Sequence, residues 1–295
     1  MDIAFLLELS ANGILIGLMY ALIALGIVLI FKSSGIANLA QGAMAMVGAY
    51  VAWALLVLAG MPLWLAIPLS LAIMFFFGTG IERVALRPMV GQPVIMVVML
   101  TLGLEILLRG LAPAIFGTAI KRLDLGIPQA PIIVGPVLIN TAYLVSGAVA
   151  LGLVLLSIMF FGTRLGTVLR AVSDDQMASW SVGIFVERAI GLSWGLAGVA
   201  AAFGGILWGS VQGVDWTLSL LLIKALAIAI LGGLDSIPGV LIAGVIIGVL
   251  ESVVPAFLDP HVGGGTRDVV ASLVILLTVI LRPHGLFGRE DIERV

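Results

Sequence analysis

Long apolar runs follow one another along almost the whole chain, separated only by short polar segments. A helix needs about 20 apolar residues to cross the hydrocarbon core of a bilayer. Only 10% of the 295 residues are charged, against about 25% in a typical soluble domain. We therefore predict an all-α, polytopic membrane protein with eight or nine spans, folded as a single domain over residues 1–295. Nine runs are candidate spans: 10–31, 37–58, 62–81, 93–117, 139–161, 189–211, 217–234, 237–257 and 268–282.

Several classes of function find no support in the residues. The net charge of −2 argues against a nucleic-acid partner, which needs a basic face. The chain has no cysteine and two histidines, His261 and His284, so neither a metal site nor a catalytic triad is expected. A phosphate-binding loop requires a glycine before Lys-Ser, whereas Phe31 precedes Lys32 and Ser33. We therefore expect no enzyme activity and no cofactor in this chain.

The lysines and arginines predict the orientation, because cytoplasmic loops carry an excess of them. If segment 162–188 is cytoplasmic, nine of the fourteen basic residues fall inside. The N-terminus is then outside and the C-terminus inside. The inside residues are Lys32, Arg83, Arg87, Arg164, Arg170, Arg188, Arg282, Arg289 and Arg294, and the outside ones are Lys121, Arg122 and Arg267.

The polar segment RAVSDDQMASWSVGIFVER, residues 170–188, interrupts this apolar chain. Ser173 followed by Gln176 matches a capping box, acids in the first turn favour a helix, and Gly183 is a plausible end. We predict a short helix over about 174–182, too short to be stable alone in water. Its apolar residues Met177, Trp180 and Val182 would rest on the membrane or on the protein's own spans, or they would bind a soluble partner.

Four ionisable residues lie inside predicted spans, where charges are costly and often functional. Glu105 and Arg109 are four residues apart, which favours a local ion pair, although they could instead line a transport path. Lys224 could extend to the outer interface or pair with Glu251 in the next span.

Two neutral polar residues, Asn38 and Gln41, stand near the start of the second predicted span. Together with Gly42 they suggest a bent or partly re-entrant segment. Their side chains either line a path at the helix break or bond the backbone groups that the break frees.

Glycines concentrate in the seventh and eighth predicted spans. Small residues allow helices to approach closely in lipid, and a G-x-x-x-G pair is typical of such contacts. We predict tight helix packing at Gly232, Gly233, Gly239, Gly244 and Gly248.

Four blocks of the sequence together resemble the permease subunits of ABC importers of the branched-chain amino acid type. GLMYALIALGIVLIF (17–31) leads into GIANLAQGAMAMVGAYVA (35–52), and TRLGTVLRAVSDDQMASWSVGI (163–184) is similar to the cytoplasmic coupling region. ALAIAILGGLDSIPGVLIAGVIIGVLES (225–252) and LRPHGLFG (281–288) match later parts of the family pattern.

The resemblance implies a multi-subunit importer in the bacterial inner membrane. Its partners would be a second homologous permease subunit, two cytoplasmic ATPase subunits that bind ATP and Mg, and an extracytoplasmic substrate-binding protein. Segment 163–187 would be the loop that couples the permease to the ATPases. The matching positions are Gly166, Arg170, Ala171, Asp174, Asp175, Ala178 and Gly183.

The substrate remains open at this level. The resemblance implies branched-chain amino acids or related small amino or carboxylic acids. Gln41, and Lys32 to Ser34, depart from the residues that many members carry and resemble members that serve varied carboxylates, including aromatic acids. The wider family also includes importers of urea and short-chain amides, so these substrates stay as alternatives. A secondary transporter with Glu105 and Glu251 as ion sites is a second class, and reconstitution without ATPases would separate the two.

Overall fold

The computed structural model describes residues 3–89, 91–128, 130–135 and 137–288. Within these residues the fold is almost entirely helical, with one two-stranded antiparallel sheet. The helices are α1 (Ile3–Ser34), α2 (Gln41–Trp53), α3 (Leu63–Ile81), α4 (Val94–Phe116), α5 (Thr141–Phe161), α6 (Arg164–Asp174), α7 (Gln176–Ser181), α8 (Val186–Gln212), α9 (Leu221–Gly232), α10 (Ile237–Val262) and α11 (Thr266–Leu281).

Short elements connect these helices. Strands β1 (Ile132–Val134) and β2 (Val137–Ile139) form a hairpin before α5. Two π-helical turns extend α2 and α3, and two 3₁₀ turns precede α4 and α9. These turns are η1 (Ala54–Leu58), η2 (Glu82–Leu86), η3 (Arg87–Met89) and η4 (Trp216–Leu220).

Each of the nine predicted spans coincides with a helix. In the described part of the chain, seven helices are long and apolar enough to cross a membrane. The predicted span 217–234 is a shorter apolar helix over Trp216–Gly232, and the predicted span 268–282 is the 16-residue α11. The protein is therefore a polytopic helical membrane protein, as the sequence predicts.

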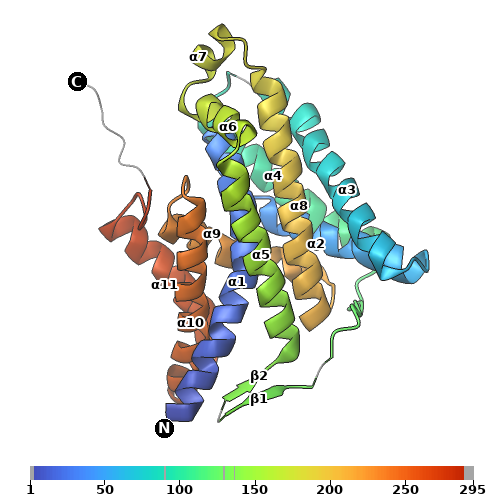
Figure 1. The fold of residues 1–295 in the computed structure, drawn as a ribbon, viewed down its shortest axis with the longest axis vertical. Coiled ribbons are helices and arrows are strands. Elements are labelled where there is room, and N and C mark those ends of the chain that lie inside the picture. The colour runs from blue at the N-terminus through green and yellow to red at the C-terminus, as the bar shows by residue number, and fades with distance from the viewer. Residues whose placement is uncertain (1–2, 90, 129, 136, 289–295) are drawn as a thin grey trace.

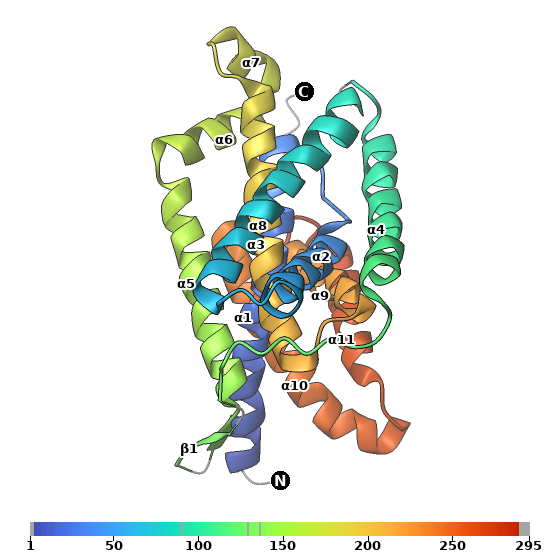
Figure 2. The ribbon, with the colours of Figure 1, turned by 90° about the vertical axis from the view of Figure 1, so that its right-hand side faces the viewer.

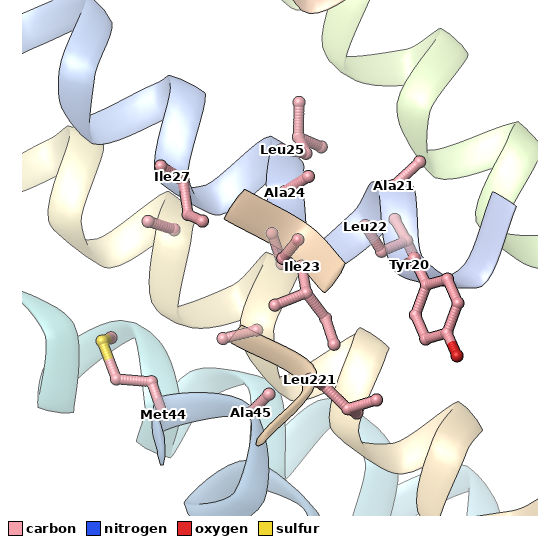
Figure 3. Close-up of a cluster of buried hydrophobic side chains, with 14 of the residues drawn as sticks. Tyr20, Ala21, Leu22, Ile23, Ala24, Leu25, Ile27, Met44, Ala45 and Leu221 are labelled. Atoms are coloured by element: carbon pink, nitrogen blue, oxygen red, sulfur yellow. The ribbon is translucent and has the colours of Figure 1, made fainter. Parts of the chain in front are cut away.

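Helix α1 is the centre of the bundle (Figure 1). Its residues from Ile16 to Ile30 are all buried, against α10, α8, α5 and α9. Side chains from α1, α2 and α9 meet there, including Ile23, Met44 and Leu221 (Figure 3). A helix buried on all sides cannot show an apolar and a polar face, which is why α1 reads as uniformly apolar.

The two ends of the bundle carry different elements (Figure 2). One end holds α6, α7 and the connection from α3 to α4, while the other holds the β-hairpin, the start of α1 and the turn from α10 to α11. The predicted inside residues Arg83, Arg87, Arg164 and Arg170 thus share one end of the molecule. Arg289 and Arg294 lie outside the described residues.

Candidate coupling loop and intramembrane polar residues

Helix α6 is an amphipathic helix that lies across one end of the bundle and leads from α5 to α7 (Figure 2). Thr163 caps its N-terminus by accepting a hydrogen bond from the Gly166 amide. The buried face of α6 consists of Gly166, Leu169 and Val172, and it packs on α1, α5 and α8. A Cβ on Gly166 would lie 2.4 Å from the Phe161 Cα, so only glycine fits this tight turn from α5.

The short helix predicted over about 174–182 is observed as α7, which begins later, at Gln176. The helical conformation is interrupted at Asp175, whose backbone is extended (φ −158°). Asp175, rather than Ser173, caps the N-terminus of α7. Its Oδ1 accepts a hydrogen bond of 2.9 Å from the Ala178 amide. Ser173 and Asp174 instead belong to the last turn of α6. The predicted capping box is therefore wrong, because Asp175 is the residue that has left the helical conformation.

Helix α7 projects from the end of the bundle (Figure 1) and packs mainly on its neighbours α6 and α8. Ser179 is its one buried residue. Met177, Trp180 and Val182 are 78%, 67% and 75% exposed. Gly183 follows with φ +86°, a conformation that favours glycine and ends the helix. Three large apolar side chains are thus exposed together at a tip outside the packed spans.

Beneath the C-terminal end of α6 lies a cavity of about 610 Å³. The ends of four chain segments meet around it, and each overlaps one of the sequence blocks described above. The cavity is lined by Phe31, Lys32 and Gly35, by Arg170, Ser173 and Asp174, by Ile230, Leu234 and Asp235, and by Val279, Pro283, His284 and Gly288. The C-terminal end of α6 therefore borders the same cavity as the ends of α1, α9 and α11.

Backbone contacts hold this junction together. Lys32 Nζ donates a hydrogen bond of 2.7 Å to the Asp235 carbonyl. The segment after α11 is fixed to the end of α9, because the Leu286 amide donates to the Leu231 carbonyl at 2.7 Å. The LRPHGLFG block (281–288) is thus hydrogen-bonded to the glycine-rich block (225–252).

The predicted packing glycines lie at close backbone approaches. Gly244 and Gly248 of α10 face Gly17 and Gly13 of α1, where a Cβ on Gly17 would lie 2.1 Å from the Gly244 carbonyl oxygen. The sequence reading did not identify the α1 glycines, although their four-residue spacing is the same signal.

Two further approaches surround the turn between α9 and α10. Gly232 and Gly239 contact each other, and a Cβ on Gly233 would lie 2.5 Å from the Gly288 amide nitrogen. Gly233 also has φ +100°, so the turn depends on glycine twice.

Asn38 and Gln41 are fully buried at the break between α1 and α2. Asn38 Oδ1 accepts from the Ala40 amide at 2.9 Å, and Asn38 Nδ2 donates to Gln41 Oε1 at 3.1 Å. Gln41 Nε2 donates to the Ala197 carbonyl of α8 at 3.0 Å, in space left open by Gly26. Of the two predicted roles, this geometry favours the one in which Asn38 and Gln41 form hydrogen bonds to backbone groups that the helix break frees. It does not favour a role in lining an open path.

The ionisable residues within the spans are paired. Arg109 Nη1 lies 3.4 Å from Glu105 Oε1 on α4. Lys224 Nζ lies 2.8 Å from Glu251 Oε1 and 2.8 Å from Asp268 Oδ1, with Lys224 and Glu251 both buried. Both carboxylates proposed for an ion-coupled transporter are thus neutralised by a neighbouring base. Among the described residues, no group of three or more His, Cys, Asp or Glu side chains could hold a metal ion.

The sequence of this chain matches that of known proteins along most of its length. Residues 9–281 match the family model described as the permease component of the branched-chain amino acid transport system. The chain belongs to this permease family.

Similar proteins match this chain over nearly their whole length. The permease protein LivH of the high-affinity branched-chain amino acid transport system of Escherichia coli K12 is 29% identical, over 99% of this chain and 98% of LivH. The corresponding protein BraD of Pseudomonas aeruginosa is 30% identical, over 100% and 99%. Among solved structures, PsaBC from Streptococcus pneumoniae in complex with Fab is 14% identical over 93% of this chain and 92% of that one, with a TM-score of 0.46.

This permease also contains an ion-pair network that the sequence reading missed. Glu82, 4% exposed in the π-helical turn after α3, lies 3.3 Å from Arg87. Arg87 also lies 3.3 Å from Glu187 in the first turn of α8. The network ties the connection between α3 and α4 to the segment that follows α7. No local sequence pattern signals it, because Arg87 and Glu187 are one hundred residues apart.

Proposed function

We propose that this chain is the membrane-spanning permease subunit of an ATP-driven importer in the bacterial inner membrane. It would form part of the translocation path for branched-chain amino acids or related small amino or carboxylic acids. Membership of the permease family supports the transport role, and the names of LivH and BraD support the substrate class. Hydrolysis of ATP, with Mg, would occur in two partner ATPase subunits, and a binding protein would deliver the substrate from outside.

The exposed tip of α7 is the single observation that carries the coupling mechanism. Met177 and Trp180 present apolar surface that the described chain leaves largely uncovered, at 78% and 67% exposure. A protein surface with an aromatic anchor is typical of a hot spot for a partner. We assign α7 as the element that an ATPase subunit binds, and α6 as the lever that carries its movement to the cavity beneath it. In this arrangement the end of the bundle that bears α6 and α7 faces the cytoplasm.

The test is a substitution that removes the anchor without touching the Asp175 cap. Trp180→Glu, made in a permease co-expressed with its ATPase subunits, is expected to lower ATPase co-purification about tenfold or more, as loss of an interface hot spot does. Val262→Glu is the matched control, since Val262 is also 67% exposed but lies at the opposite end of the bundle. Equal ATPase recovery with Trp180→Glu and with the unchanged chain would refute the assignment of α7.

Substrate identity needs a separate measurement, because in importers of this kind the binding protein selects the ligand. A thermal-shift screen of the binding protein encoded beside this permease would compare branched-chain amino acids with urea, amides and aromatic acids. A shift only with the branched-chain amino acids supports the proposed substrate class. A shift only with another class contradicts it and leaves the coupling mechanism unaffected.

A further inference from the structure

The cavity beneath the C-terminal end of α6 has the size and part of the lining of a small-molecule site. Its volume is about 610 Å³, and ligand sites in proteins typically measure about 300–1,000 Å³. Apolar side chains form one part of its lining, among them Phe31 of α1, Ile230 of α9 and Leu234 in the turn after α9. All three are only half-buried, although four chain segments meet here. The cavity therefore offers apolar surface that a ligand can cover.

Two opposite charges line the same cavity without pairing with each other. Arg170 comes from the C-terminal half of α6, and Asp235 from the turn between α9 and α10. No ion pair among the described residues involves either side chain. Arg170 Nη2 donates to Thr167 Oγ1 at 3.2 Å, which leaves further guanidinium N–H groups to donate. Both residues are half-buried, so each charge has lost part of its hydration and gains from a partner of opposite charge.

The other charged groups of the lining keep its charge balanced. Lys32 and Asp174 also line the cavity. Lys32 Nζ donates to the backbone carbonyl of Asp235 at 2.7 Å, so this bond does not use the Asp235 carboxylate. With His284 neutral, the lining carries two bases and two acids. A balanced lining of this kind gives no net attraction to an anion or to a cation, but it suits a ligand that carries both charges.

We propose that this cavity binds a small zwitterion with an apolar side chain, such as a branched-chain amino acid. The Arg170 guanidinium would bind the carboxylate in a charge-assisted pair, and the Asp235 carboxylate would bind the ammonium group. Phe31, Ile230 and Leu234 would contact the side chain. The cytoplasmic position of the site and its link to the transported substrate rest on the proposed function, whereas the ligand class rests on the opposite charges and the apolar lining.

A ligand bound in this way would connect two elements that move relative to each other in the proposed mechanism. Arg170 belongs to α6, and Asp235 belongs to the turn between α9 and α10. A ligand that contacts both favours the state in which both are within reach, because a ligand shifts an equilibrium only by binding one state better. On the cytoplasmic side this ligand is the product of import. Accumulated product would therefore resist the movement of α6 and slow further import.

Calorimetric titration of the purified permease, co-expressed with its neighbouring subunits but without the binding protein, tests the ligand class. L-Leucine is the probe, and two analogues each lack one charge: leucinamide lacks the carboxylate and 4-methylpentanoate lacks the ammonium group. Leucine is expected to bind, and each analogue about tenfold or more weakly, because each loses one charge-assisted contact. Absence of leucine binding at millimolar concentration, or equal binding of either analogue, overturns the proposal.

Two variants place the bound leucine in this cavity. Asp235→Asn and Arg170→Gln should each lower the affinity for leucine about tenfold or more. Asparagine keeps the backbone carbonyl that accepts from Lys32, so the melting temperature should not change. The matched controls are Glu8→Gln, half-buried at the opposite end of the bundle, and Arg164→Gln, exposed on α6 and not part of the lining. Unchanged leucine binding in Asp235→Asn and Arg170→Gln would locate the ligand elsewhere and refute the site.

Proteoliposomes with the ATPase subunits facing outward test the regulatory role. Leucine-loaded binding protein is enclosed, and ATP is supplied outside, where added leucine reaches only the cytoplasmic face. Added leucine is expected to lower the rate of ATP hydrolysis. Asp235→Asn should hydrolyse ATP at the unchanged rate without added leucine and lose the inhibition. No inhibition of the unchanged chain, or equal inhibition of both chains, overturns the regulatory role.

The two measurements also separate this site from the importer mechanism. Leucine binding that depends on Asp235 and Arg170, without ATP hydrolysis that the binding protein stimulates, supports the site and counts against the importer. Stimulated hydrolysis without leucine binding to the permease does the reverse.

Discussion

Helices α1 and α4 are both apolar enough to cross the membrane, yet they occupy opposite positions in the fold. Of the most apolar window, 83% is buried in α1 and 22% in α4. The difference does not come from hydrophobicity, since lipid is as apolar as a protein core. It comes from glycine contacts: Gly13 and Gly17 bring the backbone of α1 against α10, whereas Gly103 and Gly110 of α4 have no neighbour. In a membrane, apolar residues determine which segments cross, and small residues determine which of them pack.

The largest effect is expected from a single methyl group in the α1–α10 contact. Gly17→Ala would place its Cβ 2.1 Å from the Gly244 carbonyl oxygen, and two backbones must separate to admit it. Because this contact is at the centre of the bundle, we expect a loss of ~3 kcal/mol or more, at the upper end of overpacking costs. The measurement is the melting temperature and yield of the purified permease.

The matched control for this change is Gly152→Ala on α5, where a Cβ meets nothing within 4 Å. It should leave yield and melting temperature unchanged or slightly raised. Equal losses from the two substitutions would mean that burial against α10 does not distinguish α1 from the outer helices.

The sequence predicted the positions of the spans well, because length and hydrophobicity are local properties. Of the contact between α1 and α10, the sequence predicts only the α10 glycines, Gly244 and Gly248. Their partner glycines on α1 were not predicted, because they depend on which helices meet. The prediction of the residue that caps α7 was wrong for a related reason. Ser173, Asp174 and Asp175 are all capping residue types, and only the break in the backbone selects Asp175.

The ion pairs show the same limit. Glu105 and Arg109 lie on one helix, so their spacing was sufficient to suggest the pair. The pair of Lys224 with Glu251 is predictable because their helices are adjacent in sequence. The sequence does not predict that Asp268 lies 2.8 Å from Lys224, because the position of Asp268 depends on how α11 returns along α9.

The buried ion cluster is the next test of the packed region. Lys224→Met would leave Glu251, 1% exposed, with Arg267 at 3.6 Å as its remaining basic partner. Breaking a buried pair in this way costs about 3–5 kcal/mol, reduced here by that remaining arginine. Adding Glu251→Gln to Lys224→Met removes the uncompensated charge and should restore part of the melting temperature. If the double variant is no more stable than Lys224→Met, the uncompensated charge of Glu251 does not cause the loss of stability.

A smaller loss is expected from the ion pair on α4. Glu105→Ala leaves Arg109 without its carboxylate, but the arginine side chain is 37% exposed and can reorient. We expect a loss of about 1–2 kcal/mol, in the range of a hydrogen bond to a charged group, in the melting temperature of the isolated subunit. A loss as large as that of Lys224→Met would show that α4 is held in the bundle more firmly than its burial indicates.

The smallest effect, and one of opposite sign, is expected at Gly103. Glycine within a helix costs roughly 0.5–1 kcal/mol relative to alanine, and a Cβ at Gly103 meets nothing within 4 Å. Gly103→Ala should therefore raise the melting temperature of the isolated subunit slightly, where Gly17→Ala lowers it strongly. The same substitution measured in the assembled complex adds a second comparison. If a partner helix uses the space above Gly103, the gain disappears or reverses there, whereas a lipid-facing glycine gives the same small gain in both states.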